Sequence, residues 1–337
     1  MPEIQVTIAI PTLAADARLA DCVRSLEAQS RRDFAVVVVD NSGQRLARRR
    51  LDGGENLQII ENDANRGFGA AVNQVFGRSI SPFLATLNDD AVADERWLDE
   101  LLAAMESRPD AGMCASQVRL LADGQIDSAG MLICGDGSSK QRGHLESPEK
   151  YLAPADVLLP SGSAALYRRA MLDEIGGFDE DFFLYCEDTD LGLRAQWAGW
   201  TCLYAPRAVV DHAYSHTAGR ATPLKAYYVE RNRLFVLAKN FPARSLLKAP
   251  FISMVRYGWH FFFLLRGRGA AAQFREDGSG GMHLAALVIR AHWSLLRNWS
   301  SLRKKRRAIR QTARLTPESF RKLLRSHAIG AREVAGL

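Results

Sequence analysis

The sequence lacks the glycine-rich loops that hold phosphate in the two commonest kinds of nucleotide site. A short apolar segment, Val6–Ile10, has the composition of a buried strand, but Pro11-Thr12-Leu13 follows it in place of a G-x-G-x-x-G turn. A G-x-x-x-x-G-K-[ST] segment is absent as well. The usual dinucleotide and P-loop sites are therefore excluded, and a diphosphate bound to this chain needs another counter-charge.

Cysteine is scarce, and long apolar runs are missing. The five cysteines are odd in number and lack paired metal-ligand spacing, so neither a disulfide framework nor a zinc site is expected. Arg256 and His260 interrupt the most apolar part of the chain, and no run reaches the roughly 20 residues of a spanning helix. The polar opening Met1-Pro2-Glu3 predicts no secretory signal. The scattered cysteines favour a reducing, cytoplasmic location.

Acidic residues are rare in one part of the chain only. From Arg244 to Leu337 the chain has 19 Lys and Arg against 4 Asp and Glu, whereas all 337 residues have 44 and 38. The first part is therefore mildly acidic and the second strongly basic. This asymmetry predicts two domains, residues 1–243 and 244–337, of which the second faces a polyanionic surface.

Strand-like and helix-like segments alternate through the acidic part. Phe34–Val39 is a continuous apolar run typical of a strand buried on both faces. Leu98, Leu101 and Met105 recur at helical spacing. The alternation predicts an α/β fold with a mostly parallel sheet flanked by helices. The expected strands are Val6–Ile10, Phe34–Val39, Leu57–Glu61 and Phe83–Leu87, and the expected helices include Ala70–Arg78 and Trp97–Ser107.

Polar residues stand just beyond the ends of three expected strands. Asp40, Asn65 and Asp90 all fall at the edge where open α/β sheets bind ligands. The pair Asn88-x-Asp90 offers oxygen ligands of the kind that Mg²⁺ and Mn²⁺ prefer. Asp-Asn-Ser-Gly and Asn-Asp-Asp are also ordinary turn sequences, which leaves simple turn chemistry as an alternative.

A second cluster of polar residues lies near residue 188. The aromatic and apolar segment Phe182–Tyr185 directly precedes the acidic residues Glu187, Asp188 and Asp190 at an expected helix start. Acidic residues are favoured there by the helix dipole alone, which is the structural alternative. A carboxylate beside an apolar wall can also take a proton from a hydroxyl group. The aromatic segment favours this second interpretation.

Taken together, the motifs resemble glycosyltransferase family 2, the inverting GT-A enzymes, and in particular its bacterial rhamnosyltransferase-like branch. The resemblance implies a GT-A fold (nucleotide-diphospho-sugar transferase, Rossmann-like) with a basic α-helical C-terminal extension. The motifs are collinear over roughly 6–242. They are Ile10-Pro11-Thr12, Val38-Val39-Asp40-Asn41-Ser42, Asn65-Arg66-Gly67-Phe68-Gly69-Ala70-Ala71-Val72-Asn73, Leu87-Asn88-Asp89-Asp90, Gly176-Gly177-Phe178-Asp179-Glu180 with 183–194, and Tyr227-Tyr228-Val229-Glu230-Arg231-Asn232.

The resemblance implies roles for residues around the donor. In such enzymes the Asp after the second strand holds the nucleobase, which corresponds to Asp40. Thr12 is then expected on the nucleotide from the first loop. The Asn-x-Gly-Phe-Gly segment lines the donor site, which makes Asn65, Gly67 and Asn73 candidates for donor binding.

The resemblance also implies a metal site and a base. The last carboxylate of the metal motif corresponds to Asp90, with Asn88 and Asp89 beside the donor diphosphate. Many relatives have Asp where this chain has Asn88, so one strong carboxylate ligand remains. The Glu-Asp motif corresponds to Glu187 and Asp188, and Asp188 is the expected catalytic base.

A histidine is the second expected ligand of the Mg²⁺ or Mn²⁺ ion. In some relatives a His about two dozen residues after the base completes the metal shell, and His212 is similarly placed. His216 is a weaker candidate, and a structural role for either histidine stays open.

The C-terminal part combines aromatic and basic residues. Phe251, Trp259 and Phe261 stand among basic residues, and Trp299 precedes the run Arg303–Arg307. This pattern favours an anionic membrane surface, which predicts a peripheral protein on the inner face of the cell membrane. Packing of the same helices on the catalytic domain, or in a homo-oligomer, is the alternative.

The function expected from the resemblance is transfer of a sugar from a nucleotide-sugar donor to a glycan or lipid-linked acceptor, as in cell-wall polysaccharide synthesis. The branch makes dTDP-L-rhamnose the first choice of donor, and a UDP-hexose or UDP-galactofuranose the alternative. A nucleic-acid-binding protein is a competing class, because basic and aromatic residues also suit nucleic acid. This class explains only the C-terminal part, because the acidic residues at the strand ends would repel a polyanion. No nucleic-acid partner is therefore expected.

Overall fold

The computed structural model describes residues 3–51, 57–213, 222–267 and 281–336. Contacts group the chain into two compact units. The first comprises Met1–Met131, Gln141–Ala195 and Trp200–Thr217, and the second comprises Leu132–Lys140, Gln196–Gly199 and Ala218–Leu337.

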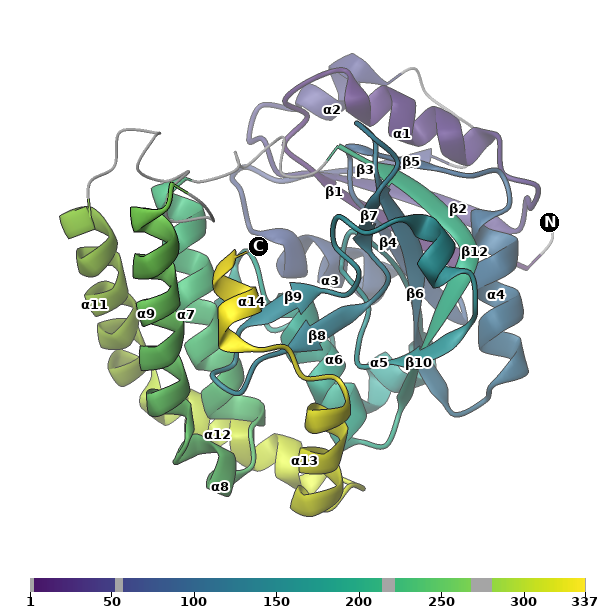
Figure 1. Ribbon diagram of the computed structural model, residues 1–337. Helices are drawn as coiled ribbons and strands as arrows, with labels where there is room; N and C mark the ends of the chain where they lie inside the picture. The colour runs from purple at the N-terminus through teal and green to yellow at the C-terminus, as the bar shows by residue number, and fades with distance from the viewer. Residues whose placement is uncertain (1–2, 52–56, 214–221, 268–280, 337) are drawn as a thin grey trace. The chain divides into compact units, whose positions relative to one another are not determined.

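The first unit is built on a ten-stranded sheet (Figure 1). The strand order is β10-β12-β6-β11-β4-β1-β2-β3, with β5 beside β12 and β7 beside β6. The neighbours β3, β2, β1 and β4 are parallel, and β11 runs antiparallel between β4 and β6. The strands are β1 (Val6–Thr12), β2 (Phe34–Asp40), β3 (Leu57–Glu61), β4 (Phe83–Leu87), β5 (Ala91–Ala93), β6 (Ala111–Leu120), β7 (Ile126–Ser128), β10 (Ala155–Val157), β11 (Ala164–Arg168) and β12 (Thr201–His212).

Alternate side chains of the central strands enter two separate cores. Val36 and Val38 of β2 pack into one core with the apolar faces of α1 and α4. Val37 and Val39 pack into the other core with α3, α5 and α6. Since both faces of the sheet are covered, residues that point to either face must be apolar. This explains the continuous apolar runs. The helices of this unit are α1 (Arg18–Glu27), α2 (Leu46–Arg50), α3 (Phe68–Arg78), α4 (Trp97–Ser107), α5 (Arg169–Ile175) and α6 (Glu187–Trp197), with the short 3₁₀ turns η1 (Pro148–Tyr151) and η2 (Glu180–Phe182).

The structure confirms the predicted α/β class and most predicted element bounds. The strands β3 and β4 and the helix α4 begin and end at the predicted residues. The helix α3 begins two residues earlier than predicted, at Phe68, because Gly67 turns the chain with a φ of 85° directly before it. This early start places the Asn-x-Gly turn at the helix N-terminus.

The second unit is helical, as predicted for the C-terminal region (Figure 1). Within it α11 packs against α7, and α14 packs against α9. Its helices are α7 (Pro223–Asn240), α8 (Ala243–Leu246), α9 (Ala249–Leu265), α11 (Gly281–Arg297), α12 (Trp299–Gln311), α13 (Pro317–Ser326) and α14 (Ala331–Gly336), and the strands β8 (Met131–Ile133) and β9 (Ser139–Gln141) form a separate pair.

The helix α7 belongs to the second unit by its contacts, whereas the sequence analysis places it before the boundary at residue 243. The difference has a packing reason, since Tyr227 and Ala226 of α7 pack with Leu287 of α11. Compact units are groups of contacts and not independently folding domains. The domain boundary at residue 243 therefore stays a prediction.

Candidate active site

The carboxyl ends of β1, β2 and β4 bring polar side chains to one edge of the sheet. In the register of β1 and β2, Thr12 lies opposite Asp40. The Thr12 hydroxyl donates a hydrogen bond to the carboxylate of Asp89, which follows β4. Burial raises the pKa of Asp89 to about 6, although the hydrogen bond from Thr12 opposes this shift. The edge therefore already joins three of the residues expected around a nucleotide.

The carboxylate of Asp40 organises the loop that follows β2. Its two oxygens accept hydrogen bonds from the backbone N–H groups of Ser42 and Ala47, both at 2.8 Å. The side chain is almost completely buried, with 1% of its residue surface exposed. Each carboxylate oxygen has a second lone pair, so these bonds fix Asp40 while leaving it able to accept from a base.

The Asn65–Gly67 turn is held against the loop that precedes the expected base. The Asn65 side-chain oxygen accepts from the Gly67 N–H at 2.9 Å. A Cβ at Gly67 would lie 2.2 Å from the carbonyl oxygen of Phe183, and the N–H of Phe68 donates to that same carbonyl at 3.0 Å. Glycine is required at this position by both the backbone angle and the close approach.

Asn73 contacts protein groups through both ends of its amide. Its Nδ2 donates to the Phe178 carbonyl at 2.9 Å and to Glu180 at 3.0 Å, and its Oδ1 accepts from the Phe178 N–H at 2.8 Å. These bonds fix the Gly-Gly-Phe-Asp-Glu loop on α3. They support a positioning role for Asn73, whereas its expected donor contact stays a prediction.

Asp90 and His212 lie side by side although 122 positions separate them in the sequence. The strand β12 ends at His212, and β5, which contains Ala91, pairs with that end. His212 Nε2 is 3.1 Å from Asp90 Oδ1 and 3.2 Å from Asn88 Nδ2. Both Asp90 and His212 are buried. The two residues expected to bind metal are thus brought together at the same edge.

A third buried residue, Asp127 of β7, completes this group. Its Oδ2 is 2.9 Å from His212 Nδ1. Burial disfavours the imidazolium, but hydrogen bonds to Asp127 and Asp90 outweigh burial and raise the pKa of His212 to about 9. Burial likewise disfavours the Asp90 carboxylate, and the hydrogen bond and charge of His212 outweigh it and lower the pKa of Asp90. The two carboxylates therefore favour a protonated His212 at neutral pH, and a metal on Nε2 would have to replace the proton on that nitrogen.

The Asp90 and His212 atoms fit a divalent ion that is shared with a substrate. Among residues 3–336, as far as the structure describes them, no three His, Cys, Asp or Glu side chains are arranged to hold a metal alone. Neighbouring ligands of an octahedral ion with bonds near 2.1 Å lie about 3 Å apart, which matches Asp90 Oδ1 and His212 Nε2. Mg²⁺ commonly takes one or two carboxylates and completes its shell with phosphate and water.

Asp188 is held at the start of α6 by the neighbouring loop. Its Oδ2 accepts from the Gly162 N–H at 3.0 Å, and its Oδ1 accepts from the Thr189 N–H at 2.6 Å. Burial raises the pKa of Asp188, and these hydrogen bonds oppose the rise. Asp188 is half-buried as a residue, and the two hydrogen bonds fix its carboxylate.

Glu187 differs from Asp188 in its surroundings. It is buried, and its Oε2 has no hydrogen-bond partner among the described residues. Burial and the adjacent charge of Asp188 raise the pKa of Glu187 to about 8. Glu187 is therefore a neutral carboxylic acid at pH 7, and it adds no second negative charge beside Asp188.

Two hydrogen bonds of neighbouring residues, Gly162 and Ser163, connect the Asp188 region to the Asp90 region. The Ser163 carbonyl accepts from the Asn88 N–H at 2.8 Å, and the adjacent Gly162 N–H holds Asp188. Ser163 directly precedes β11, which begins beside the carboxyl end of β4 because the two strands are antiparallel. The expected base and the expected metal ligands therefore share one edge of the sheet.

The loop directly before Glu187 has an unusual backbone. Phe183, Tyr185 and Cys186 have φ angles of 64°, 68° and 65°. Non-glycine residues rarely adopt such angles, and they persist only where the surroundings enforce them. The Gly67–Phe183 contact is one such constraint. Strain of this kind marks the segment as a candidate functional loop.

Other expected positions have different outcomes. His216 lies in 214–221, outside the described residues.

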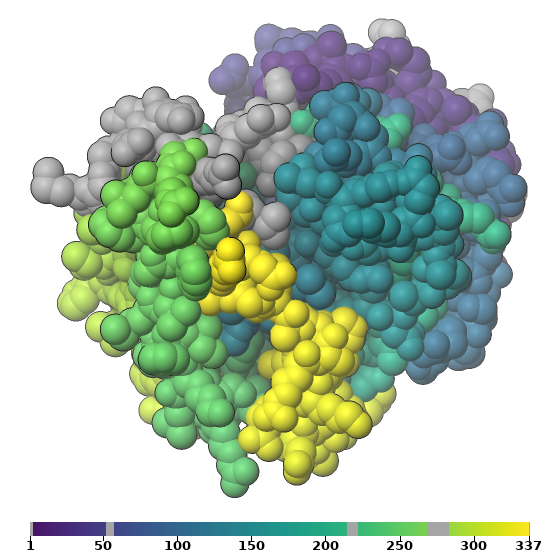
Figure 2. All heavy atoms as spheres, in the orientation of Figure 1, coloured from purple at the N-terminus to yellow at the C-terminus, as the bar shows by residue number. Residues whose placement is uncertain are grey.

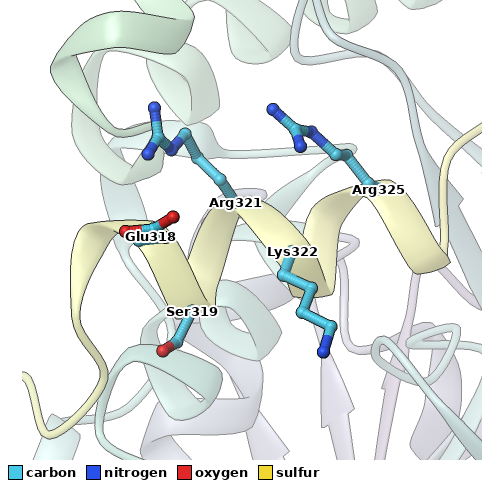
Figure 3. A pocket seen from close by; sticks show the side chains of 5 residues that line it. All are labelled: Glu318, Ser319, Arg321, Lys322 and Arg325. Atoms are coloured by element: carbon cyan, nitrogen blue, oxygen red, sulfur yellow. The ribbon is translucent and has the colours of Figure 1, made fainter.

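A cavity of about 260 Å³ lies along α13 of the second unit, and Figure 3 shows basic side chains around it. The cavity contains none of the residues of the sheet edge. Its lining residues are Glu318, Ser319, Arg321, Lys322 and Arg325.

The fold and this edge define a class of protein, the GT-A glycosyltransferases. The crystal structure of GalNAc-T7 with UDP, GalNAc and Mn²⁺ matches with a TM-score of 0.60 over 76% of this chain and 51% of that chain, at 14% identity. At this identity the similarity shows the fold alone. The sequence profile of Glycosyl transferase family 2 matches residues 7–176, and the chain belongs to this family.

Two curated relatives support the rhamnosyltransferase-like branch. The chain is 29% identical over 230 residues to the N-acetylglucosaminyl-diphospho-decaprenol L-rhamnosyltransferase of Mycobacterium tuberculosis, covering 60% of this chain and 75% of the relative. It is 24% identical over 217 residues to the O-antigen chain rhamnosyltransferase WbaN of Salmonella anatum, covering 63% and 67%.

The sequence analysis missed Asp127 and Gly162. Asp127 lies in Ile126-Asp127-Ser128, a strand of three residues that the pattern did not distinguish from a turn. Gly162 contributes only a backbone N–H, which a motif of side chains does not reveal. The pairing of β6 with both β7 and β12 brings Asp127 close to His212. This pairing is known only from the structure.

Proposed function

We propose that this family 2 glycosyltransferase moves L-rhamnose from dTDP-L-rhamnose to a hydroxyl group of a polyprenyl-linked glycolipid or glycan, with inversion. The names of the two curated relatives support rhamnose as the sugar, and the first of them supports a polyprenyl-linked acceptor. The observation that carries the proposal is the fixed carboxylate of Asp188 at the edge that also holds Asp90. A UDP-sugar is the alternative donor.

In the proposed reaction Asp188 removes the proton from the acceptor hydroxyl. The freed oxygen attacks the anomeric carbon while the bond from that carbon to the diphosphate oxygen breaks, and the electron pair leaves with the nucleoside diphosphate. One base on the face opposite the leaving group produces inversion without a covalent intermediate. The bonds from Gly162 and Thr189 hold the Asp188 carboxylate in one orientation throughout.

Asp90 and His212 are the proposed metal-binding side chains, with Thr12 and Asp89 beside them. A bound Mg²⁺ or Mn²⁺ ion supplies positive charge that stabilises the departing diphosphate. Asp40 accepts from the nucleobase, and Asn65 and Gly67 shape the wall between base and donor. Glu187 keeps its proton beside Asp188.

The test is a transfer assay with an N-acetylglucosaminyl-diphospho-polyprenol acceptor and a panel of dTDP- and UDP-sugars. We expect the fastest transfer from dTDP-L-rhamnose, an anomeric configuration opposite to that of the donor by NMR, and loss of transfer in EDTA. Faster transfer from a UDP-sugar would show that the proposed donor is wrong, and it would leave the proposed mechanism unchanged. Retention of configuration would reject Asp188 as the base of a single displacement.

We also propose that the second unit binds an anionic membrane surface. Exposed apolar residues recur along one face of α9, which contributes to the surface drawn in green in Figure 2. A second exposed set lies on α11. In the described residues no helix has the length and hydropathy needed to cross a bilayer. The two sets are Phe251, Met254, Val255, Phe261, Phe262 and Leu265 on α9, and Ile289, Trp293 and Leu296 on α11.

Vesicle flotation tests this second proposal. We expect the protein to float with vesicles of phosphatidylglycerol and not with neutral phosphatidylcholine, and salt to weaken the binding. The triple variant Phe251→Ser, Phe261→Ser, Leu265→Ser should lose most of the binding. The exposed residues Leu121 and Leu152 of the first unit, each changed to Ser, provide the matched control. Equal binding of both variants would reject the surface.

A further inference from the structure

Asp127 is a buried carboxylate that the reaction described above does not use. It lies on β7 with 2% of its surface exposed. The strand β6 pairs with β7 through Val118 and Ser128, and with β12 through Leu120 and His212. The backbone of one sheet therefore fixes both Asp127 and His212, and this allows a contact of 2.9 Å between Oδ2 and Nδ1.

A second imidazole lies near the other oxygen of the Asp127 carboxylate. His144 Nδ1 is 3.3 Å from Asp127 Oδ1 and 3.1 Å from the main-chain oxygen of Asp127. The two imidazole rings therefore approach the two oxygens of one carboxylate. Oδ1 forms no hydrogen bond with the described residues, so the bond between Oδ2 and His212 Nδ1 is the one that orients the carboxylate.

The geometry decides which nitrogen of His212 can bind a ligand. Each ring nitrogen of His212 faces a carboxylate that accepts hydrogen bonds, Nδ1 that of Asp127 and Nε2 that of Asp90. A cation between His212 and Asp90 would take the place of the Nε2 proton, while the contact with Asp127 keeps the proton on Nδ1. Nε2 is then the nitrogen that remains for a metal, and it is the one that faces Asp90 Oδ1. Ligating histidines commonly donate their other N–H to a carboxylate, which fixes the tautomer and the ring orientation.

We propose that Asp127 is a positioning residue that holds His212 with Nε2 toward a divalent cation shared with Asp90. This inference rests on the proposed function, because it concerns the metal of the same site. Asp127 acts through the ring of His212 and is not itself a ligand. The imidazole separates its Oδ2, which contacts Nδ1, from the Nε2 atom that faces Asp90.

The test measures Mn²⁺ binding by electron paramagnetic resonance, with the ion alone and with dTDP, on the full chain. Asp127→Asn keeps the side-chain shape and should lower the Mn²⁺ affinity ten- to hundredfold. The affinity for dTDP in EDTA should not change. His144→Gln removes the other partner of Asp127 and should change the Mn²⁺ affinity less than threefold. Should Asp127→Asn fail to fold by circular dichroism, Asp127→Ser replaces it.

A double-mutant cycle separates positioning from a structural effect. In a His212→Gln background Asp127→Asn should change the Mn²⁺ affinity less than threefold, because the residue through which it acts is gone. Wild-type Mn²⁺ affinity of Asp127→Asn, or an equal loss in both backgrounds, would overturn the inference.

The same measurements keep this inference apart from the proposed function. Transfer from dTDP-L-rhamnose at an unchanged rate in EDTA, without Mn²⁺ binding, would overturn the inference and leave the transferase. Mn²⁺ binding that depends on Asp127, without transfer from any donor of the panel, would overturn the proposed function and leave the inference.

Discussion

The sheet edge of the first unit and the helical second unit give their buried carboxylates different partners. In the second unit, Asp136 and Glu230 face Arg233 and Arg256, and we call these four residues the buried ion cluster. Arg256 Nε is 2.6 Å from Asp136, and its Nη2 is 2.9 Å from Glu230. Each carboxylate of this cluster therefore meets a guanidinium.

At the sheet edge of the first unit, several carboxylates lack such a partner. Burial raises the pKa of Asp89 to about 6 and, together with Asp188, that of Glu187 to about 8. In the buried ion cluster the balance is reversed. Burial there also opposes ionisation, but the hydrogen bond and charge of Arg233 and the charge of Arg256 lower the pKa of Glu230 to about 2.

The charges of the buried ion cluster stabilise the fold, whereas the unpaired carboxylates at the sheet edge are available for chemistry. A paired cluster has no remaining affinity for a proton or a cation, because arginine already satisfies it. An unpaired carboxylate retains both, and perturbed pKa values of this kind gather at functional sites. Removal of a charge should therefore affect activity at the sheet edge and stability in the buried ion cluster.

The largest effect is expected for Asp188→Asn. Loss of the base should lower the rate of sugar transfer by about a thousandfold, since general-base catalysis contributes roughly 10²–10⁴. The affinity for the nucleoside diphosphate should stay within about threefold, because Asp188 does not face the diphosphate in the proposed reaction. Kinetic assays and calorimetry measure the two quantities. Asp181→Asn, an exposed carboxylate of the same loop, is the control, and equal rates for both variants would contradict the assignment.

Arg256→Leu should produce the second-largest effect, on stability. It leaves Asp136 and Glu230 buried with one guanidinium between them, and breaking a buried pair typically costs about 3–5 kcal/mol. Urea unfolding followed by circular dichroism measures the change. Arg207→Leu removes an exposed partner of Glu100 and should cost less than about 1 kcal/mol. A neutral result for Arg256→Leu would show that the cluster does not stabilise the fold.

The pH dependence of stability should show whether His212 forms ion pairs with Asp90 and Asp127, as the arginines do in the buried ion cluster. Its pKa is raised to about 9, so its ion pairs stabilise the folded state fully below about pH 6.5. This contribution, roughly 3 kcal/mol, is lost as the pH rises from 6.5 through 9. His212→Gln should flatten the unfolding free energy over that window relative to wild type. Parallel curves for the two proteins would mean that His212 does not pair with Asp90 and Asp127 in solution.

The strand ends were predictable from the sequence because apolar runs stop at Asp or Asn. β3 and β4 have the predicted bounds, and Asp40 and Asp90 fall at the edge where the pattern placed them. The approach of His212 to Asp90 was expected from a family resemblance and not from spacing. Their contact depends on the pairing of β5 with β12, which joins segments far apart in the chain.

The surroundings of the acidic residues were not predictable. Glu187 and Asp188 are adjacent and chemically similar in the sequence, yet one is buried without a partner for Oε2 and the other accepts from Gly162. This division follows from the helix turn, which directs successive side chains about 100° apart. It also follows from the left-handed residues Phe183, Tyr185 and Cys186, for which no glycine signals the backbone.

The smallest effect is expected for Glu187→Gln, and it sharpens the contrast between the two adjacent acids. Because the folded pKa is raised to about 8, the folded state holds a proton that the unfolded state releases above about pH 4.5. Wild-type stability therefore falls as the pH rises from 4.5 to 8, whereas glutamine has no proton to release. Glu187→Gln should be more stable relative to wild type at pH 8.5 than at pH 4.5, measured by thermal unfolding, and should retain most of its transfer activity at pH 7. A loss of transfer as large as that of Asp188→Asn would mean that Glu187 exchanges its proton during the reaction, and the two acids would then act as one pair.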